Sequence, residues 1–130
     1  MVTSGATTVL NPLLYKTLRY DAARDFVPVA GIVSNYQALA AHPGLPANSI
    51  AELIALAKAK PGELNYSSSG TGSSSHLAME LLKYMTGINV VHVPFKGSGQ
   101  AMPNLLAGQV QLVFDPMPSS LPHEIGRAHV

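Results

Sequence analysis

The chain has 130 residues, which is enough for one domain with a core of its own. It is 47% hydrophobic and 12% charged, with a net charge of +1, whereas about 25% of residues are charged in ordinary soluble domains. There is no basic stripe, and five Tyr and three Phe are scattered, which argues against a nucleic-acid-binding protein. No apolar stretch approaches the roughly 20 residues of a membrane span. The absence of Cys excludes disulfides and thiolate zinc sites.

The first third of the chain predicts short and irregular elements. Residues 1–6 have the pattern of a strand end, and Asn11 with Pro12 predicts a short helical turn. Residues 20–25 are polar and predict a loop. Residues 26–41 predict extended structure that is broken near Ser34 and Asn35.

Two amphipathic helices are predicted in the middle of the chain. Ser49 and Glu52 have the spacing of a capping box, and the helix that they begin ends before Pro61. Apolar residues at helical spacing predict a second helix over residues 74–86, with Gly87 directly after it.

Strands alternate with helices in the second half. Residues 64–68, 88–93 and 110–114 predict strands, and a short helix is expected over residues 100–107. This alternation indicates an α/β fold with a parallel sheet, and such sheets bind ligands at the carboxyl ends of their strands. Polar or flexible residues follow all three strands, namely residues 69–73, residues 95–98 and Asp115. If the strands are neighbours, the three clusters meet at one edge.

The run of Gly, Ser and Thr over residues 65–76 is the most informative segment. A glycine- and hydroxyl-rich turn before a helix can bind an anion, because the helix start has unpaired N–H groups and a partial positive charge. The alternative is a surface turn with a helix cap. Gly70 and Gly72 do not continue into a dinucleotide fingerprint, since Ser75 stands at the third glycine position. Lys96-Gly97-Ser98 has the wrong order for a Walker loop, and no Gly-x-Ser-x-Gly elbow is present.

Three further residues are candidates for ligand contacts. His76 lies in the first turn behind the serine-rich loop, Lys96 is the cation in a strand-end loop, and Asp115 follows an apolar strand. Their alternative roles are a structural histidine, a solvated lysine and a cap. The histidines show no pair at metal-ligand spacing, and we expect no metal and no cofactor.

Together these segments resemble the periplasmic solute receptors of tripartite tricarboxylate transporters, also called Bug receptors. The matching segments occur in family order and cover residues 3–123. They are residues 11–15, 20–21, 25–29, 49–62, 64–78, 92–97 and 108–115.

The resemblance implies a clamshell of two α/β lobes that closes on a small carboxylate, which is a dicarboxylate, a tricarboxylate, an acidic amino acid or an aromatic acid. It implies periplasmic localisation and membrane permease subunits as partners, without insertion of the receptor into the membrane. It places Asp115 at the variable end of the ligand. The implied ligand-binding residues are Ser4 and Gly5 from the first lobe and Ser69, Gly70, Thr71, Gly72, Ser73, Ser74, His76, Lys96, Gly97, Ser98 and Asp115 from the second.

The resemblance also predicts that the chain is a fragment. Residues 1–33 would be an incomplete edge of the first lobe, with residues 3–9 and 26–33 as strands whose sheet edges are exposed. Residues 34–123 would be a nearly complete second lobe. Residues 124–130 have the sequence of a translated sequencing adapter and would be an artefact. The signal peptide of the family is absent from these residues, and half a cleft is expected to bind weakly.

Two other functions remain open from the sequence. The first is an α/β enzyme that acts on a carboxylate or phosphate ester and uses the serine–glycine turn as an anion cradle. The second is a scaffold without a ligand. We favour a binding protein without catalysis, because the sequence has no paired carboxylates and no nucleophile with a base.

Overall fold

The computed structural model describes residues 5–124, which fall into two compact units, Met1–Ser34 and Asn35–Val130. This boundary lies one residue from the predicted one. That the units are lobes of a clamshell stays a prediction.

The described part of the first unit is helical or irregular. It holds the π-helix η1 (Ala6–Leu10) and the short helices α1 (Asn11–Leu14) and α2 (Ala22–Asp25). The predicted strands over residues 3–9 and 26–33 are therefore wrong wherever the structure describes them, since residues 26–33 have no regular secondary structure. A strand needs a hydrogen-bonded neighbour, and the described residues of this unit provide none.

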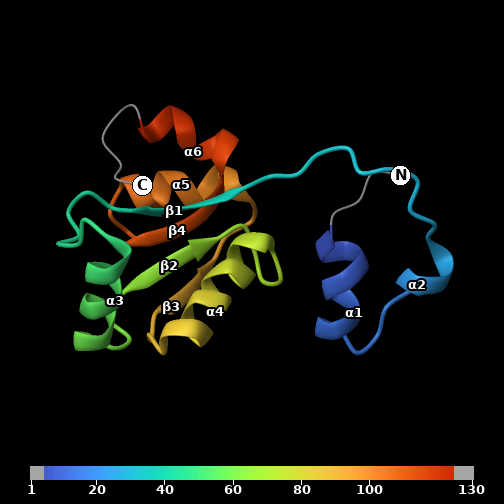
Figure 1. Cartoon of the computed structure of the whole chain (residues 1–130), viewed down its shortest axis with the longest axis horizontal. Helices are drawn as coiled ribbons and strands as arrows, with labels where there is room; N and C mark the ends of the chain where they lie inside the picture. Colours follow the sequence, from blue (N-terminus) through green and yellow to red (C-terminus); the bar gives the residue numbers. More distant parts are fainter. Residues whose placement is uncertain (1–4, 125–130) are drawn as a thin grey trace. The chain divides into compact units, whose positions relative to one another are not determined.

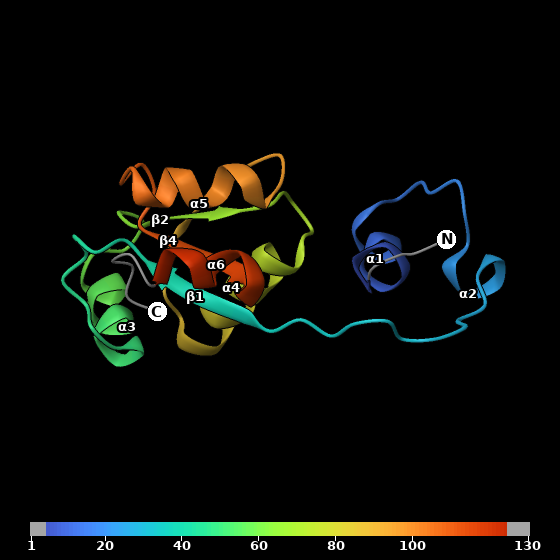
Figure 2. The ribbon, with the colours of Figure 1, turned by 90° about the horizontal axis from the view of Figure 1, so that it is seen from above.

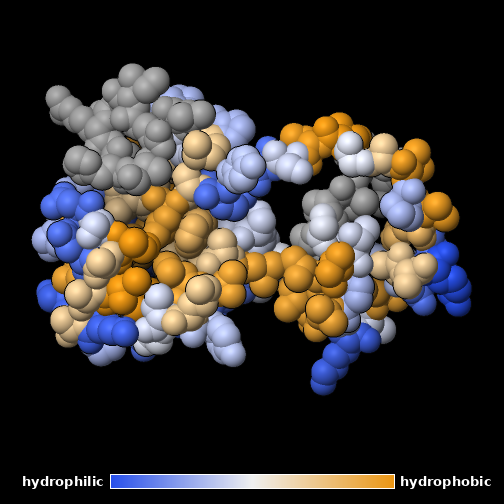
Figure 3. Space-filling view, in the orientation of Figure 1, coloured by the Kyte–Doolittle hydropathy of each residue, from blue (hydrophilic) through white to orange (hydrophobic). Residues whose placement is uncertain are grey.

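The polar segment before residue 26 is a helical turn rather than the predicted loop. The Asp21 carboxylate caps α2 by accepting from the N–H groups of Ala23 (3.0 Å) and Arg24 (3.3 Å). Most large apolar side chains of this unit are exposed, and much of its visible surface is apolar in Figure 3. The residues of this unit whose burial the structure describes thus form no buried core.

The second unit is a four-stranded sheet with helices on both faces (Figure 1). The strand order is β1-β4-β2-β3, with β2 parallel to both β3 and β4 and with β1 antiparallel to β4. The strands are β1 (Gln37–Ala41), β2 (Asn65–Ser68), β3 (Val91–Pro94) and β4 (Leu112–Pro116). The helices are α3 (Ile50–Ala59), α4 (Ser74–Thr86), α5 (Ser98–Leu106) and α6 (Met117–Glu124). No helix within residues 5–124 combines the length and the apolar character needed to cross a membrane.

The predicted α/β fold with parallel strands is confirmed, and α4 has the predicted bounds. Ser73 caps α4 by accepting from the N–H of His76, and Gly87 ends it in the left-handed conformation at φ 72°. The capping box at α3 also forms, although Glu52 accepts from the N–H of Asn48 rather than Ser49. Strand β1 lies within the extended structure predicted for residues 26–41, but its antiparallel pairing at the edge and the last helix α6 were not predicted.

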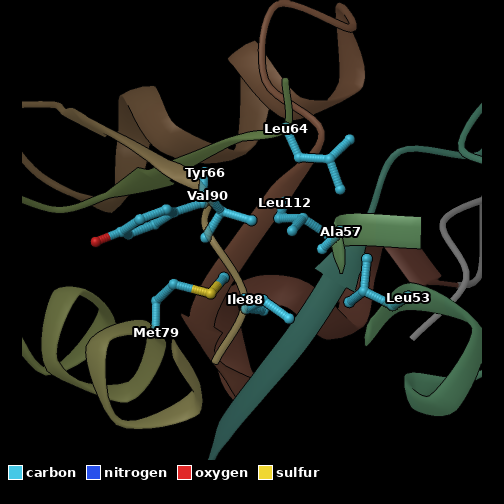
Figure 4. Close-up of a cluster of buried hydrophobic side chains, with 8 residues drawn as sticks. All are labelled: Leu53, Ala57, Leu64, Tyr66, Met79, Ile88, Val90 and Leu112. Carbon is cyan, nitrogen blue, oxygen red and sulfur yellow. The ribbon is translucent and has the colours of Figure 1, made fainter. Parts of the chain in front are cut away.

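Two apolar clusters hold the sheet, one on each face. In Figure 2, α5 lies on one side of the strands and α3 and α4 lie on the other. The larger cluster, drawn in Figure 4, consists of Leu53, Ala57, Leu64, Tyr66, Met79, Ile88, Val90 and Leu112. The other consists of Ala40, Ala101, Met102, Leu105, Val110 and Val113. Neighbouring residues of β4 thus face opposite clusters, as the period of two in a strand requires.

Met79 and Met85, both on α4, provide a matched test of this core. Met79 is fully buried and Met85 is 74% exposed. We expect Met79→Ala to lower the free energy of unfolding by about 2–5 kcal/mol and Met85→Ala to change it by about 0.5 kcal/mol or less. Urea unfolding followed by circular dichroism measures both. Equal losses in the two variants would contradict the assignment of the buried face.

Candidate functional site

The carboxyl ends of the three parallel strands lie at one edge of the sheet, as predicted. The loops that follow β2 and β3 are joined by backbone hydrogen bonds, from Phe95 N–H to the Ser68 carbonyl (3.0 Å) and from Gly97 N–H to the Ser69 carbonyl (3.2 Å). Helices α4 and α5 begin at these two loops and then cover opposite faces of the sheet (Figure 2). In doubly wound sheets the crevice between two such loops is where ligands bind.

Ser75 holds the turn after β2 in place. Its side chain is buried, with the residue 2% exposed. The Ser75 Oγ accepts from the Ser69 N–H (3.1 Å) and lies 3.1 Å from the Ser69 Oγ and 3.0 Å from the Ser73 Oγ. The sequence analysis did not include Ser75 among the site residues. No residue pattern distinguishes Ser75 from the neighbouring serines, because only the fold determines that its side chain is buried.

The two glycines of the turn donate to side chains of the protein itself. The Gly72 N–H donates to the Nδ1 of His76 (3.1 Å). The Gly70 N–H donates to the Oγ of Ser68 (3.2 Å), and this hydroxyl lies 2.6 Å from the Nε2 of His92. Both N–H groups therefore already have acceptors within the protein, so other N–H groups must bind an anion here.

Donors without an acceptor lie in the first turns of α4 and α5. No acceptor occurs within the described residues for the N–H groups of Ser74, Ser75, Ser98 or Gly99. Such groups, together with the two helix dipoles, favour an anion in front of both helices. Gly97, at φ 104°, makes the turn into α5 without a side-chain cap.

The remaining predicted residues of the second unit surround this edge. Thr71 and Lys96 are exposed, and Lys96 is fixed through its backbone N–H, which donates to the Gln100 side chain (3.3 Å). Gln37, which the sequence analysis did not single out, begins β1 at the same edge and donates from its Nε2 to the Ser74 Oγ (3.4 Å). The antiparallel direction of β1 brings its first residue to this edge.

Asp115 is buried in β4, with 1% exposure, rather than open at a strand end. Its carboxylate accepts from the Ser119 Oγ, which belongs to the first turn of α6. The Ser119 Oγ also lies 2.8 Å from the Pro116 carbonyl. Asp115 therefore ties β4 to α6 in addition to any role in ligand binding.

Three aromatic rings form a stack below the glycine turn. The His92 ring lies between Tyr66 and His76, with centroid distances of 4.8 Å and 4.1 Å. The Glu80 carboxylate accepts from the Tyr66 hydroxyl (2.7 Å) and from the Lys83 ammonium (2.8 Å), and its Oε1 lies 4.0 Å from the His76 Nε2. Tyr66, Glu80, Lys83 and the two histidines are thus one connected group.

This group changes the titration of its members. Burial lowers the pKa of His92, and the neighbouring His76 lowers it further. Burial alone would raise the pKa of Glu80, but the hydrogen bonds from Lys83 and Tyr66 outweigh it and hold that pKa below the usual 4.5. Burial and the bond to Glu80 raise the pKa of the Tyr66 hydroxyl far above its usual value. At neutral pH the group holds an anionic Glu80 and a neutral His92.

The two residues predicted from the first lobe belong to the first unit. Gly5 is exposed in the other unit, and Ser4 lies outside the described residues. Of the predicted artefact segment, residues 125–130 also lie outside them.

A cavity of about 330 Å³ lies elsewhere in the second unit, between β1 and the start of α3. Its lining has no charged side chain and consists of Leu39, Ala41, Ala47, Asn48, Ser49, Ile50 and Leu53. The Ser49 Oγ and the Asn48 N–H already cap α3 through Glu52. One helix starts beside this cavity, whereas two helix starts and the exposed Lys96 lie at the strand-end edge, so that edge remains the better candidate for an anion.

A sequence profile of the tripartite tricarboxylate transporter family receptor matches residues 1–127. The chain belongs to this family. The protein BugT of Bordetella pertussis is 35% identical over 120 residues, which are 92% of this chain and 37% of that protein. A second protein of the same organism is 40% identical over 105 residues, which are 79% of this chain and 32% of that protein. The chain thus spans about a third of the length of these curated relatives.

Solved structures of this receptor family have the same fold. The R. palustris protein Rpa4515 with adipate is 41% identical, with a TM-score of 0.81 over 88% of this chain and 39% of that one. MatC (Rpa3494) of Rhodopseudomonas palustris with bound malate is 28% identical, with a TM-score of 0.81 over 96% of this chain and 44% of that one. The likeness to periplasmic binding proteins confirms the predicted fold class.

Removing the Ser75 hydroxyl tests the inner support of the turn. We expect Ser75→Ala to lower the free energy of unfolding by about 1–3 kcal/mol, because the partly buried Ser69 N–H loses its acceptor. The neighbouring variant Ser74→Ala, at an exposed position, should cost about 0.5 kcal/mol or less. Urea unfolding compares the two, and a loss at Ser74 as large as at Ser75 would contradict this assignment.

We expect the lowered pKa of Glu80 to make the folded protein lose stability in acid. Its pKa is lowered in the folded state, so the unfolded state binds more protons and the contribution of Glu80 is complete only above about pH 4.5. Stability should fall as the pH drops from there through the folded pKa, and Glu80→Gln should have a flatter curve. Unfolding measured from pH 7 to pH 3 tests this, and parallel curves for the two proteins would refute it.

Proposed function

We propose that this chain forms one side of the ligand cleft of a periplasmic solute-binding receptor for small carboxylates. The observation that carries the proposal is the meeting of two helix starts at one sheet edge, where the N–H groups of Ser74, Ser98 and Gly99 have no acceptor among the described residues. The partial charges of these N–H groups and the charge of the exposed Lys96 attract a carboxylate, and no buried ion pair is needed to bind it.

Most of the predicted contacts take a direct role in this proposal. Thr71, Ser73, Ser74 and Ser98 supply hydroxyls or amides to one carboxylate, and the glycines at positions 70, 72 and 97 give the loops their shape. Asp115 acts at the far end of the ligand, and Ser4 and Gly5 remain proposed ligand contacts. A structure of a similar protein contains adipate and another contains malate, which supports a carboxylate with a second polar end. Delivery to membrane permease subunits is proposed from the family description.

The enzyme alternative has one structural argument in its favour. The Ser68 Oγ lies 2.6 Å from the His92 Nε2, which is the distance between a nucleophile and its base. However, Ser68 is fully buried and also binds the Gly70 N–H, so this hydroxyl is not positioned to attack a substrate. The family match to receptors likewise favours binding over catalysis.

Blocking the start of α5 tests the proposed site. A Cβ atom at Gly99 would meet no other atom within 4 Å, and the backbone there is not in the left-handed region, so Gly99→Trp adds a side chain without backbone strain. We expect adipate to shift the amide signals of Ser74 and Ser98 in NMR spectra of the chain, with the millimolar affinity of an incomplete cleft. The Gly99→Trp variant should lose these shifts.

The control is Ala107→Trp, at the exposed opposite end of the same helix, which should retain the shifts. Adipamide, the neutral diamide of adipate, should cause none, because the helix starts select negative charge. Retained adipate binding in Gly99→Trp would refute the site. Equal shifts from adipate and adipamide would refute an anion site.

A further inference from the structure

We propose that His76 is a positioning residue that holds the glycine turn in its binding conformation only while its ring is neutral. The proposal deepens the proposed function, because the turn supported by this ring is part of the candidate carboxylate site. Its basis is the contact between the His76 ring and the Gly72 amide, together with the groups packed against that ring.

The first contact connects His76 to the turn directly. The Nδ1 of His76 accepts the Gly72 N–H at 3.1 Å, so this nitrogen has a lone pair and carries no proton. A second proton would go to Nδ1, where two donors would then face each other. Because Gly72 is buried at φ 81°, its amide has no water at hand to replace the lost acceptor.

The second contact connects His92 to the turn through Ser68. The buried Ser68 Oγ lies 2.6 Å from the His92 Nε2 and accepts from the Gly70 N–H at 3.2 Å. His92 is also stacked on His76, at 4.1 Å and 16° between the ring planes, so a proton on one ring disfavours a proton on the other. The Ser68 hydroxyl can also donate to the Gly70 carbonyl (3.2 Å), so a protonated His92 can still donate to this hydroxyl. His92 therefore acts on the turn chiefly by disfavouring a proton on His76.

The charged groups around the rings determine the direction of the effect. Tyr66 of β2 stacks on His92 from the other side, and from α4 the Glu80 carboxylate faces His76 at 4.0 Å while Lys83 binds Glu80. Because Lys83 already pairs with Glu80, a proton on His76 would add one positive charge to the group, which on its own favours a bound anion. We infer that the loss of the acceptor for Gly72, which acts on the turn itself, outweighs this attraction and that protonation weakens carboxylate binding.

His42 offers a matched control elsewhere in the same unit. Its Nδ1 accepts the Gly44 N–H at 3.0 Å, which is the same kind of contact, but it follows the last residue of β1 at the opposite edge of the sheet. Asn is the test substitution at both positions, because its amide oxygen can replace the Nδ1 acceptor and does not titrate.

The experiment follows the Gly70 and Gly72 amide signals of the chain from pH 8 to pH 5, together with the ¹⁵N shifts of the imidazoles. We expect an unprotonated His76 Nδ1 at pH 8, and Gly72 signals that change together with the His76 imidazole shifts as the pH falls. His76→Asn should remove the Gly72 titration, whereas His42→Asn should leave it unchanged. Adipate affinity should fall about fivefold from pH 7.5 to pH 5.5 in the parent chain and stay constant in His76→Asn.

Gly72 signals that stay constant across this range, or that titrate equally in His76→Asn, would overturn the proposal. A protonated Nδ1 at pH 8 would overturn it as well, and this result needs only the parent chain. Adipate affinity that rises in acid would overturn it too, because the imidazolium charge would then outweigh the loss of the acceptor. A chain that binds no adipate at pH 7.5 but shows the Gly72 titration would refute the proposed ligand and retain the positioning role.

Discussion

The candidate site depends on how the turn after the central strand satisfies its own buried polar groups. Strand β2 lies between two parallel neighbours, so its end is enclosed by the loops on both sides. The Ser69, Gly70 and Gly72 amides cannot all reach water there, and the side chains of Ser75, Ser68 and His76 accept their hydrogen bonds. This internal network leaves the first turn of α4 as the free donor surface.

The same principle explains how a chain with so few charges can provide an anion site. Peptide dipoles at two helix starts give positive potential without a buried cation, and thus without the cost of removing a cation from water. The hydrogen bonds between the loops after β2 and β3 fix the two starts relative to each other. Rigid donors of this kind lower the entropy that a small ligand must lose on binding.

The sequence predicted those parts of the molecule whose signals are local. The bounds of α4 follow from the serine cap, the apolar spacing and Gly87, and the parallel strands follow from alternation with helices. It did not predict β1 as an antiparallel edge, because strand direction depends on the distant partner β4. The strand predictions in the first unit failed because extended residues without a pairing neighbour form no sheet.

The sequence predicted where the site lies. It predicted less well which side chains make the hydrogen bonds there. A run of serines gives no sign of which hydroxyl turns inward, so the roles of Ser75 and Ser68 came only from the fold. His92 was not chosen as a site residue, because its contact with Ser68 joins residues 24 positions apart in the chain. Such contacts are long-range in sequence, and composition and spacing do not report them.

The most direct test of the central claim is a crystal structure of this protein grown with adipate. The account predicts one carboxylate of the ligand within hydrogen-bonding distance of the N–H groups at the starts of both α4 and α5, between the two joined loops. A carboxylate found in the apolar cavity beside α3, or bound only to side chains away from both helix starts, would contradict it.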